Sequence, residues 1–149
     1  KKEKDVNKDK QMEELFKTKI DYNKLGGKEQ ESFNYAKTAF KLAEYGFHCN
    51  LIPADKHGAD MIAYHISTGK IISIQLKGSR ATLNKKYKDK NIWIAYIDQR
   101  TDELCMYDHD LAVGIFEKGQ SALTESWLVK GQYSGMSLHN QFNDIIIRL

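Results

Sequence analysis

The sequence has 149 residues and a mass of 17.2 kDa, which fits one domain of ordinary size. Its hydrophobic fraction of 41% can form one core, so folding needs no disulfide or structural zinc. The net charge of +3 and the pI of about 8.7 are only mildly basic and do not by themselves indicate a nucleic-acid partner. No apolar run approaches the ~20 residues of a membrane span, so we expect a cytoplasmic protein without a membrane partner.

Two cysteines, Cys49 and Cys105, lie inside apolar runs, and neither belongs to a CxxC pair. This spacing excludes a zinc ribbon and predicts two buried free thiols in a reducing compartment. The lysine-rich start is not followed by an apolar segment, so it does not have the pattern of a secretory signal.

Residues 1–27 are expected to form a polar arm and a short helix, ahead of a single domain over residues 28–149. Residues 1–14 are almost entirely polar, which predicts a frayed or disordered arm. A short helix is expected next, with apolar side chains on one side: Met12, Leu15, Phe16 and Ile20. Gly26 and Gly27 mark a loop.

The clearest helix is predicted over residues 28–45, because apolar residues recur there every three or four positions. The expected buried stripe is Phe33, Ala36, Phe40 and Ala43. Gly46 is a suitable residue to end the helix. A strand over residues 47–52 and a loop over residues 53–58 follow.

A hairpin is predicted next, with strands over residues 60–66 and 70–77 joined by a short turn that contains Gly69. Residues 91–98 are apolar throughout, which is typical of a strand covered on both faces. The core or the sheet is therefore the expected place of Trp93 and Tyr96.

Residues 103–107 are predicted to form a further strand, followed by a short helix that is capped by Asp108 and runs to Phe116. A later loop contains Trp127 and Tyr133. Residues 137–149 are predicted to close the chain as a helix. Its expected buried stripe is Leu138, Phe142, Ile145, Ile146 and Leu149. The order of elements predicts an α/β or α+β sheet flanked by helices.

The hairpin presents a group of polar side chains on one face. Side chains alternate along a strand, so Ser73, Gln75 and Lys77 point away from the apolar side. Asp60 begins the partner strand and can lie near Gln75 and Lys77. A carboxylate and an amide oxygen suit a hard cation such as Mg²⁺, and a lysine nearby suits phosphodiester hydrolysis.

This hairpin resembles the PD-(D/E)XK nuclease superfamily, whose pattern is an acid on one hairpin strand and acid-x-Lys on the next. Gly58-Ala59-Asp60 matches the first part and Gln75-Leu76-Lys77 the second. The family also places an acid on a preceding helix, where Glu31 fits best and Glu29 is the alternative. The resemblance covers residues 29–98, about half of the chain.

The resemblance implies a restriction endonuclease-like core, with a central mixed sheet flanked by helices in a single domain. It implies Mg²⁺, with Mn²⁺ able to substitute, held by Asp60, Gln75 and Glu31. Lys77 would act on the attacking water or on the charge of the transition state. The implied substrate is DNA, most simply double-stranded DNA cut by a homo-oligomer, a dimer or tetramer, that supplies two active sites. Restriction, intron homing and Holliday-junction resolution share this chemistry.

The sequence departs from the family pattern at two positions. Ala59 replaces a common proline, which leaves the carboxylate chemistry unchanged. Gln75 replaces the second acid and removes one negative charge from the site. Glutamine at this position is found in methyl-directed restriction nucleases and in one branch of intron-encoded homing enzymes.

A basic segment, residues 77–90, follows the hairpin and contains six basic residues against one acid, Asp89. It is either a stripe that follows DNA phosphates or a solvated loop. The residues expected to contact DNA are Lys56, His57, Ser79, Arg80, Lys85, Lys86 and Lys88.

Simpler interpretations stay open for these residues. Asp60 can be a turn acid, and Gln75 with Lys77 can be the solvated face of an edge strand. Glu31 can be an ordinary acid of a first helical turn. The run Asp108-His109-Asp110 is better explained by helix capping than by metal binding. For the whole chain, the alternatives are an inactive nucleic-acid-binding module on the same fold and a protein with no nucleic-acid role.

Overall fold

The computed structural model describes residues 2–53 and 57–149. Its helices are α1 (Lys2–Leu15), α2 (Gly27–Ala43), α3 (His109–Phe116), α4 (Glu125–Leu128) and α5 (Met136–Gln141). Its strands are β1 (Phe47–Leu51), β2 (Met61–His65), β3 (Ile71–Leu76), β4 (Thr82–Asn84), β5 (Ile92–Asp98), β6 (Glu103–Asp108), β7 (Gln132–Ser134) and β8 (Ile147–Arg148). Three short 3-10 turns are η1 (Tyr22–Lys24), η2 (Lys85–Tyr87) and η3 (Gln120–Leu123).

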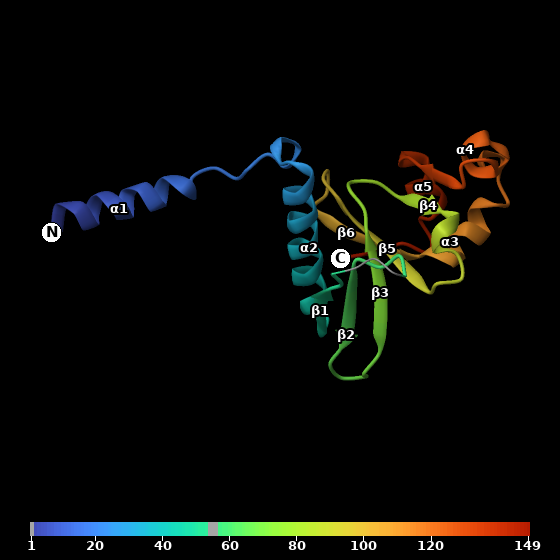
Figure 1. The fold of residues 1–149 in the computed structure, drawn as a ribbon, viewed down its shortest axis with the longest axis horizontal. Coiled ribbons are helices and arrows are strands. Elements are labelled where there is room, and N and C mark those ends of the chain that lie inside the picture. The colour runs from blue at the N-terminus through green and yellow to red at the C-terminus, as the bar shows by residue number, and fades with distance from the viewer. Residues whose placement is uncertain (1, 54–56) are drawn as a thin grey trace. The chain divides into compact units, whose positions relative to one another are not determined.

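Six strands form one mixed sheet in the order β1-β2-β3-β5-β6-β8. Strands β3 and β5 are parallel, and every other neighbouring pair in this sheet is antiparallel. Figure 1 shows α2 on one side of the sheet and α3 and α5 on the other. The predicted central mixed sheet flanked by helices is therefore confirmed. Strands β4 and β7 form a separate two-stranded sheet.

Strand β5 lies at the centre of the fold because both of its faces are apolar. Ala95 belongs to one hydrophobic cluster, which includes Leu42 of α2. Ile94 belongs to the other cluster, which includes Phe116 of α3 and Phe142. Both β5 residues are fully buried. The sequence prediction of a strand covered on both faces is confirmed.

The sheet face that carries Ile94 is covered only in part. Residues paired across neighbouring strands share a face, and Gln75 is paired with Ile94. Over β5 and β6 this face is buried under α3 and α5. Over the hairpin it is open, since the side chains of Ile62, Tyr64 and Ile71 are exposed there. Gln75 therefore lies where the covered part of the face meets the open part.

Helix α2 packs on the sheet through a different stripe from the predicted one. Its buried residues are Asn34, Thr38 and Leu42, and 65% of the Phe40 side chain is exposed. The prediction was wrong because it assigned the larger apolar residues to the inner face. Small polar side chains occupy that face instead, next to Tyr35, whose hydroxyl donates to the main-chain oxygen of Cys49 (3.2 Å).

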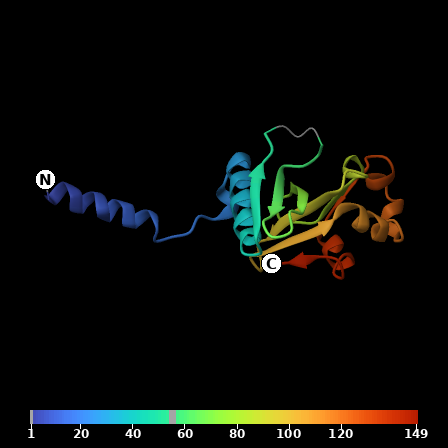
Figure 2. The same cartoon turned by 90° about the horizontal axis from the view of Figure 1, so that it is seen from below.

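The predicted closing helix over residues 137–149 is also wrong. Helix α5 ends at Gln141, and the chain then reaches the edge of the sheet as β8, shown beside β6 in Figure 2. Leu104 and Leu149 exchange two main-chain hydrogen bonds of 2.8 and 2.9 Å. Three consecutive isoleucines precede this pairing, and β-branched residues favour a strand over a helix.

The polar start of the chain is helical rather than disordered, as α1 covers Lys2–Leu15. The reason is that this stretch contains good helix formers and neither glycine nor proline. The chain divides into two compact units, Lys1–Gln30 and Glu31–Leu149. The expected division after residue 27 stays a prediction. Among the helices in the described residues, none combines the length and apolar character that a bilayer crossing needs.

Several local predictions are confirmed. The hairpin forms with Gly69 in its turn at φ +72°, a conformation that favours glycine. Asp108 caps α3 by accepting a hydrogen bond from the main-chain nitrogen of Leu111 (3.0 Å). Cys49 and Cys105 are free thiols, of which only Cys105 is fully buried.

The covered and open parts of the sheet face that carries Ile94 predict a contrast in stability between two isoleucine positions. Replacing the buried Ile94 with alanine should lower the free energy of unfolding by about 2–5 kcal/mol, because it leaves a cavity in the central strand. The matched control, Ile71→Ala on the exposed face of β3, should change it by about 0.5 kcal/mol or less. Urea denaturation of both variants measures this, and equal losses would contradict the assignment of a covered and an open part to this sheet face.

Candidate functional site

The hairpin register brings Asp60 and Gln75 directly opposite each other. Met61 pairs with Ile74, and the main-chain nitrogen of Asp60 donates to the oxygen of Ile74 (2.9 Å). The main-chain oxygen of Asp60 accepts from the nitrogen of Ile52 (2.9 Å). Asp60 is therefore fixed through its backbone between the ends of two strands, which limits where its carboxylate can lie.

The Asp60 carboxylate binds the second half of the motif. Its Oδ2 accepts hydrogen bonds from the Gln75 side-chain Nε2 (2.7 Å) and from the main-chain nitrogen of Leu76 (3.0 Å). Gln75 Nε2 also donates to the main-chain oxygen of Leu76 (3.3 Å). The amide nitrogen thus lies against two oxygens, one of them charged. The expected proximity of Asp60 and Gln75 is what the structure describes.

Gln75 has an unusual environment for an amide. The residue is 7% exposed, and its Oε1 is buried with no hydrogen-bond donor in residues 2–53 and 57–149. The orientation of the amide follows from its contacts, because the reverse orientation would press Oε1 against the same two oxygens. A buried amide oxygen without a donor costs free energy. Gln75 is therefore not the solvated edge-strand residue of the simpler interpretation.

The oxygens around Gln75 fit a hard cation. The amide nitrogen occupies a position next to Asp60 Oδ2 and the Leu76 oxygen, both of which are suitable Mg²⁺ ligands. Rotation of the side-chain amide would add Oε1 as a third ligand oxygen. In the described part of the chain, no three or more His, Cys, Asp and Glu side chains are placed to hold a metal ion. Such an ion would therefore depend on amide and main-chain oxygens.

Lys77 lies on the same side of β3 as Gln75 and is half-buried. Its Nζ donates to the hydroxyl of Tyr87 (2.9 Å). Tyr87 is 1% exposed and belongs to η2, in the basic segment. Sequence reasoning missed this contact, because Tyr87 looks like one apolar residue in a run of lysines.

Gly58 connects Tyr87 to the first half of the motif. It adopts φ +82°, and a Cβ at this position would lie 2.9 Å from both Tyr87 Cδ1 and Ile92 Cδ1. Only glycine fits both the conformation and the space. The Gly58-Ala59-Asp60 segment is therefore seated directly against the ring that binds Lys77.

The expected helical acid, Glu31, lies on α2 rather than on the hairpin. Glu31 is exposed near the start of α2, one turn before the buried Asn34 on the same stripe. Within the described residues, no hydrogen bond or ion pair joins Glu31 to Asp60, Gln75 or Lys77. Its metal-binding role stays a prediction. Glu29, the alternative, belongs to the first compact unit.

The residues expected to contact DNA are mostly exposed. Lys56 lies outside the described residues. The others all have exposed side chains: His57, Ser79, Arg80, Lys85, Lys86 and Lys88. Two of the lysines lie over aromatic rings, with Lys85 Nζ 5.0 Å from the Trp127 ring centre and Lys86 Nζ 5.0 Å from that of Tyr87. The segment is an ordered structure, β4 followed by η2, and its role in binding DNA stays a prediction.

His109 is bonded to the main chain of the basic segment. The residue is 0% exposed, and its Nε2 accepts from the main-chain nitrogen of Asn84 (3.1 Å). Burial lowers the pKa of His109, and its contact with Asp110 opposes this shift. The neutral ring is thus a structural hydrogen-bond acceptor for Asn84. Trp127 is likewise buried in the core rather than presented on a loop.

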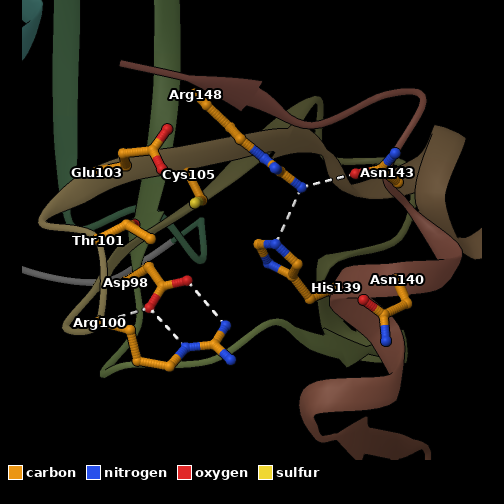
Figure 3. Close-up of a pocket in the computed structure, with 9 residues that line it drawn as sticks. All are labelled: Asp98, Arg100, Thr101, Glu103, Cys105, His139, Asn140, Asn143 and Arg148. Atoms are coloured by element: carbon orange, nitrogen blue, oxygen red, sulfur yellow. Dashed lines mark hydrogen bonds and ion pairs between the residues drawn. The ribbon is translucent and has the colours of Figure 1, made fainter.

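A second polar site lies between β5, β6, α5 and β8, around a cavity of about 420 Å³ (Figure 3). Arg148 donates to His139 Nε2 (3.0 Å) and to Asn143 Oδ1 (2.7 Å). Because His139 Nε2 accepts, its Nδ1 carries the proton toward the hydroxyl of Tyr96. Burial, and then the charge of Arg148, lower the pKa of His139. The sequence pattern contained no signal for this network.

No protein family matches the sequence, and no curated protein is similar to it. Among solved structures, the chain is similar to a bacterial homing endonuclease, with a TM-score of 0.45 and 9% sequence identity. The similarity covers 58% of this chain and 72% of the endonuclease chain. A likeness this distant assigns no activity.

The buried His109 predicts a specific pH dependence of stability. Since its pKa is lowered in the folded protein, the unfolded chain takes up this proton at a higher pH than the folded chain. The contribution of His109 to the free energy of unfolding is therefore complete above about pH 6.5 and is lost as the pH falls below it.

His109→Gln, which keeps an acceptor for Asn84, should lose less stability than the unchanged protein between about pH 7.5 and about pH 5.5. Urea unfolding at the two pH values measures the difference. Equal losses in both proteins would contradict the assignment of a buried neutral histidine.

Proposed function

We propose that this protein is a metal-dependent endonuclease that hydrolyses phosphodiester bonds in DNA. The observation that supports this most directly is the Gln75 amide, which lies between Asp60 and the Leu76 oxygen and leaves its own oxygen buried without a donor in the described residues. A structural glutamine would use both ends of its amide. A divalent cation would use the same three oxygens as ligands.

The proposed ion is Mg²⁺, with Mn²⁺ as a substitute, which Asp60, Gln75 and the main chain of Leu76 would hold, with Glu31 as the expected further ligand. When bound, the ion polarises the phosphoryl oxygens and lowers the pKa of a water molecule. Lys77 lies on the same side of β3 as Gln75, from where it would orient or deprotonate the attacking water or offset charge on the phosphate. The attack breaks the bond between phosphorus and the leaving sugar oxygen, which takes up a proton.

The substrate class follows from the surroundings of this site. The open sheet face over the hairpin gives access for a large polyanion. Lys86 of the basic segment lies over the ring of Tyr87, the residue whose hydroxyl accepts from Lys77. We infer that the substrate is double-stranded DNA, cut as in restriction or intron homing. A homo-oligomer would supply the second active site that cutting both strands needs.

Cleavage assays test this assignment. We expect the protein to cut supercoiled or linear duplex DNA with Mg²⁺ or Mn²⁺ and to be inactive in EDTA. Asp60→Ala and Lys77→Ala should reduce the rate by at least about a hundredfold, because each removes a group that acts at the reacting phosphate. Cleavage that persists in both variants would contradict the assignment of Asp60 and Lys77 to the active site.

Substitutions of Gln75 test the proposed metal site most directly. Gln75→Glu should keep activity and bind Mn²⁺ more tightly, since it adds a charged ligand, whereas Gln75→Leu should lose both activity and Mn²⁺ binding. A thermal shift with Mn²⁺ measures binding without DNA. If Mn²⁺ fails to stabilise the unchanged protein, and DNA is bound without being cut, the inactive nucleic-acid-binding module is the better description. Branched DNA in the same assay tests the resolvase alternative.

The basic segment predicts a salt-dependent affinity. The triple variant Lys85→Ala, Lys86→Ala, Lys88→Ala should weaken DNA binding and lower the slope of log K against log salt by about 2–3, as each lysine that contacts a phosphate releases about one counterion. The charge-matched control replaces Lys8, Lys10 and Lys19 in the N-terminal unit. A fluorescence titration at several salt concentrations compares them, and equal effects would show that only net charge matters.

A further inference from the structure

We propose that Tyr87 is the positioning residue of the site, which fixes the ammonium of Lys77 and the Gly58-Ala59-Asp60 segment relative to each other. The catalytic part of this inference rests on the proposed nuclease function. The structural part, that one buried tyrosine sets the place of Lys77, stands on the geometry alone.

The hydroxyl of Tyr87 acts on Lys77. A lysine side chain is long and flexible, so an ammonium that must act on one atom needs a fixed partner. The 2.9 Å hydrogen bond from Lys77 Nζ to Tyr87 Oη supplies one. The tyrosine itself cannot move freely, since it is 1% exposed and its ring packs against His109 in a T-shaped contact at 90°, with ring centres 5.6 Å apart.

The ring of Tyr87 acts on the other half of the motif. Gly58 is seated so closely against it that no Cβ fits between them. Asp60 lies two residues further along the chain, and its backbone is bonded to Ile52 and Ile74. A displacement of the ring would therefore move the start of the Asp60 segment, and loss of the hydroxyl would remove the hydrogen bond that orients the Lys77 ammonium. The Tyr87 side chain therefore contacts both Gly58, at the start of the Asp60 segment, and the Lys77 ammonium.

The position of Tyr87 also links the site to the proposed DNA contacts. The residue ends η2, whose first turn is capped by Asn84 Oδ1 accepting from the main-chain nitrogen of Lys86 (3.0 Å). The Lys86 ammonium lies over the same tyrosine ring. The short turn that presents lysines to a phosphate backbone is thus the turn that holds Lys77 in place.

Tyr87→Phe tests the hydroxyl while it keeps the ring against Gly58 and His109. The matched control is Tyr133→Phe, which removes a hydroxyl from a partly buried tyrosine packed on Phe116. We expect Tyr87→Phe to lower kcat for DNA cleavage about tenfold with KM changed less than about twofold, because it removes the hydrogen bond that orients Lys77 without affecting DNA contacts. Tyr133→Phe should leave both unchanged, and both variants should melt like the unchanged protein.

Two further measurements separate positioning from general damage. In the double variant Lys77→Ala, Tyr87→Phe, the loss in kcat should equal that of Lys77→Ala alone, because the tyrosine acts through the lysine. In ¹⁵N-labelled protein, the side-chain NH₃⁺ signal of Lys77, identified by its absence from Lys77→Arg, should be visible and should broaden in Tyr87→Phe. The control variant should keep it.

The outcomes distinguish this inference from the proposed function. If the protein cuts no DNA but the Lys77 signal depends on Tyr87, the nuclease proposal fails and the positioning role stands. If the protein cuts DNA and Tyr87→Phe is fully active with an unchanged Lys77 signal, the positioning role fails alone. Additive losses in the double variant would also overturn it.

Discussion

The pairing of Asp60 opposite Gln75 across β2 and β3 is the constraint on which the rest of the site depends. A slip of one residue in this register would turn Gln75 into the core and bring Leu76 or Ile74 to the open face. The buried pair Met61 and Ile74 opposes such a slip, because both would lose their apolar surroundings. The hydrophobic core under α2 therefore fixes the register that places Asp60 opposite Gln75.

Local patterns were sufficient to predict the hairpin and the central strand. The alternation of residues 71–77 identified which side chains face the same way, and the continuous apolar run of β5 identified a strand covered twice. Asp60 and Gln75 could be predicted as neighbours for the same reason, since only a short turn separates their strands. In such cases the relevant contacts are close in sequence, so the pattern determines them.

Patterns failed where distant segments decide the outcome. Helix α2 buries Asn34 and Thr38 in place of Phe40, because its inner face has to fit closely over a sheet that its own sequence does not describe. The end of the chain pairs with β6, more than forty residues away, so its helical periodicity was misleading. Tyr87 contacts Lys77, and His109 packs against Tyr87, through contacts between separate elements. No motif spacing indicates such residues.

The parallel arrangement of β3 and β5 has a consequence for how this protein can diversify. Parallel neighbours cannot be joined by a tight turn, so the chain must cross from the end of β3 back to the start of β5. That crossover contains the basic segment. Its length is a requirement of topology rather than of chemistry, and surface connections tolerate changes in length at small entropic cost. The exposed positions of this crossover, such as Lys85, Lys86 and Lys88, can therefore vary, provided that the buried Ala81, Leu83 and Tyr87 keep their places.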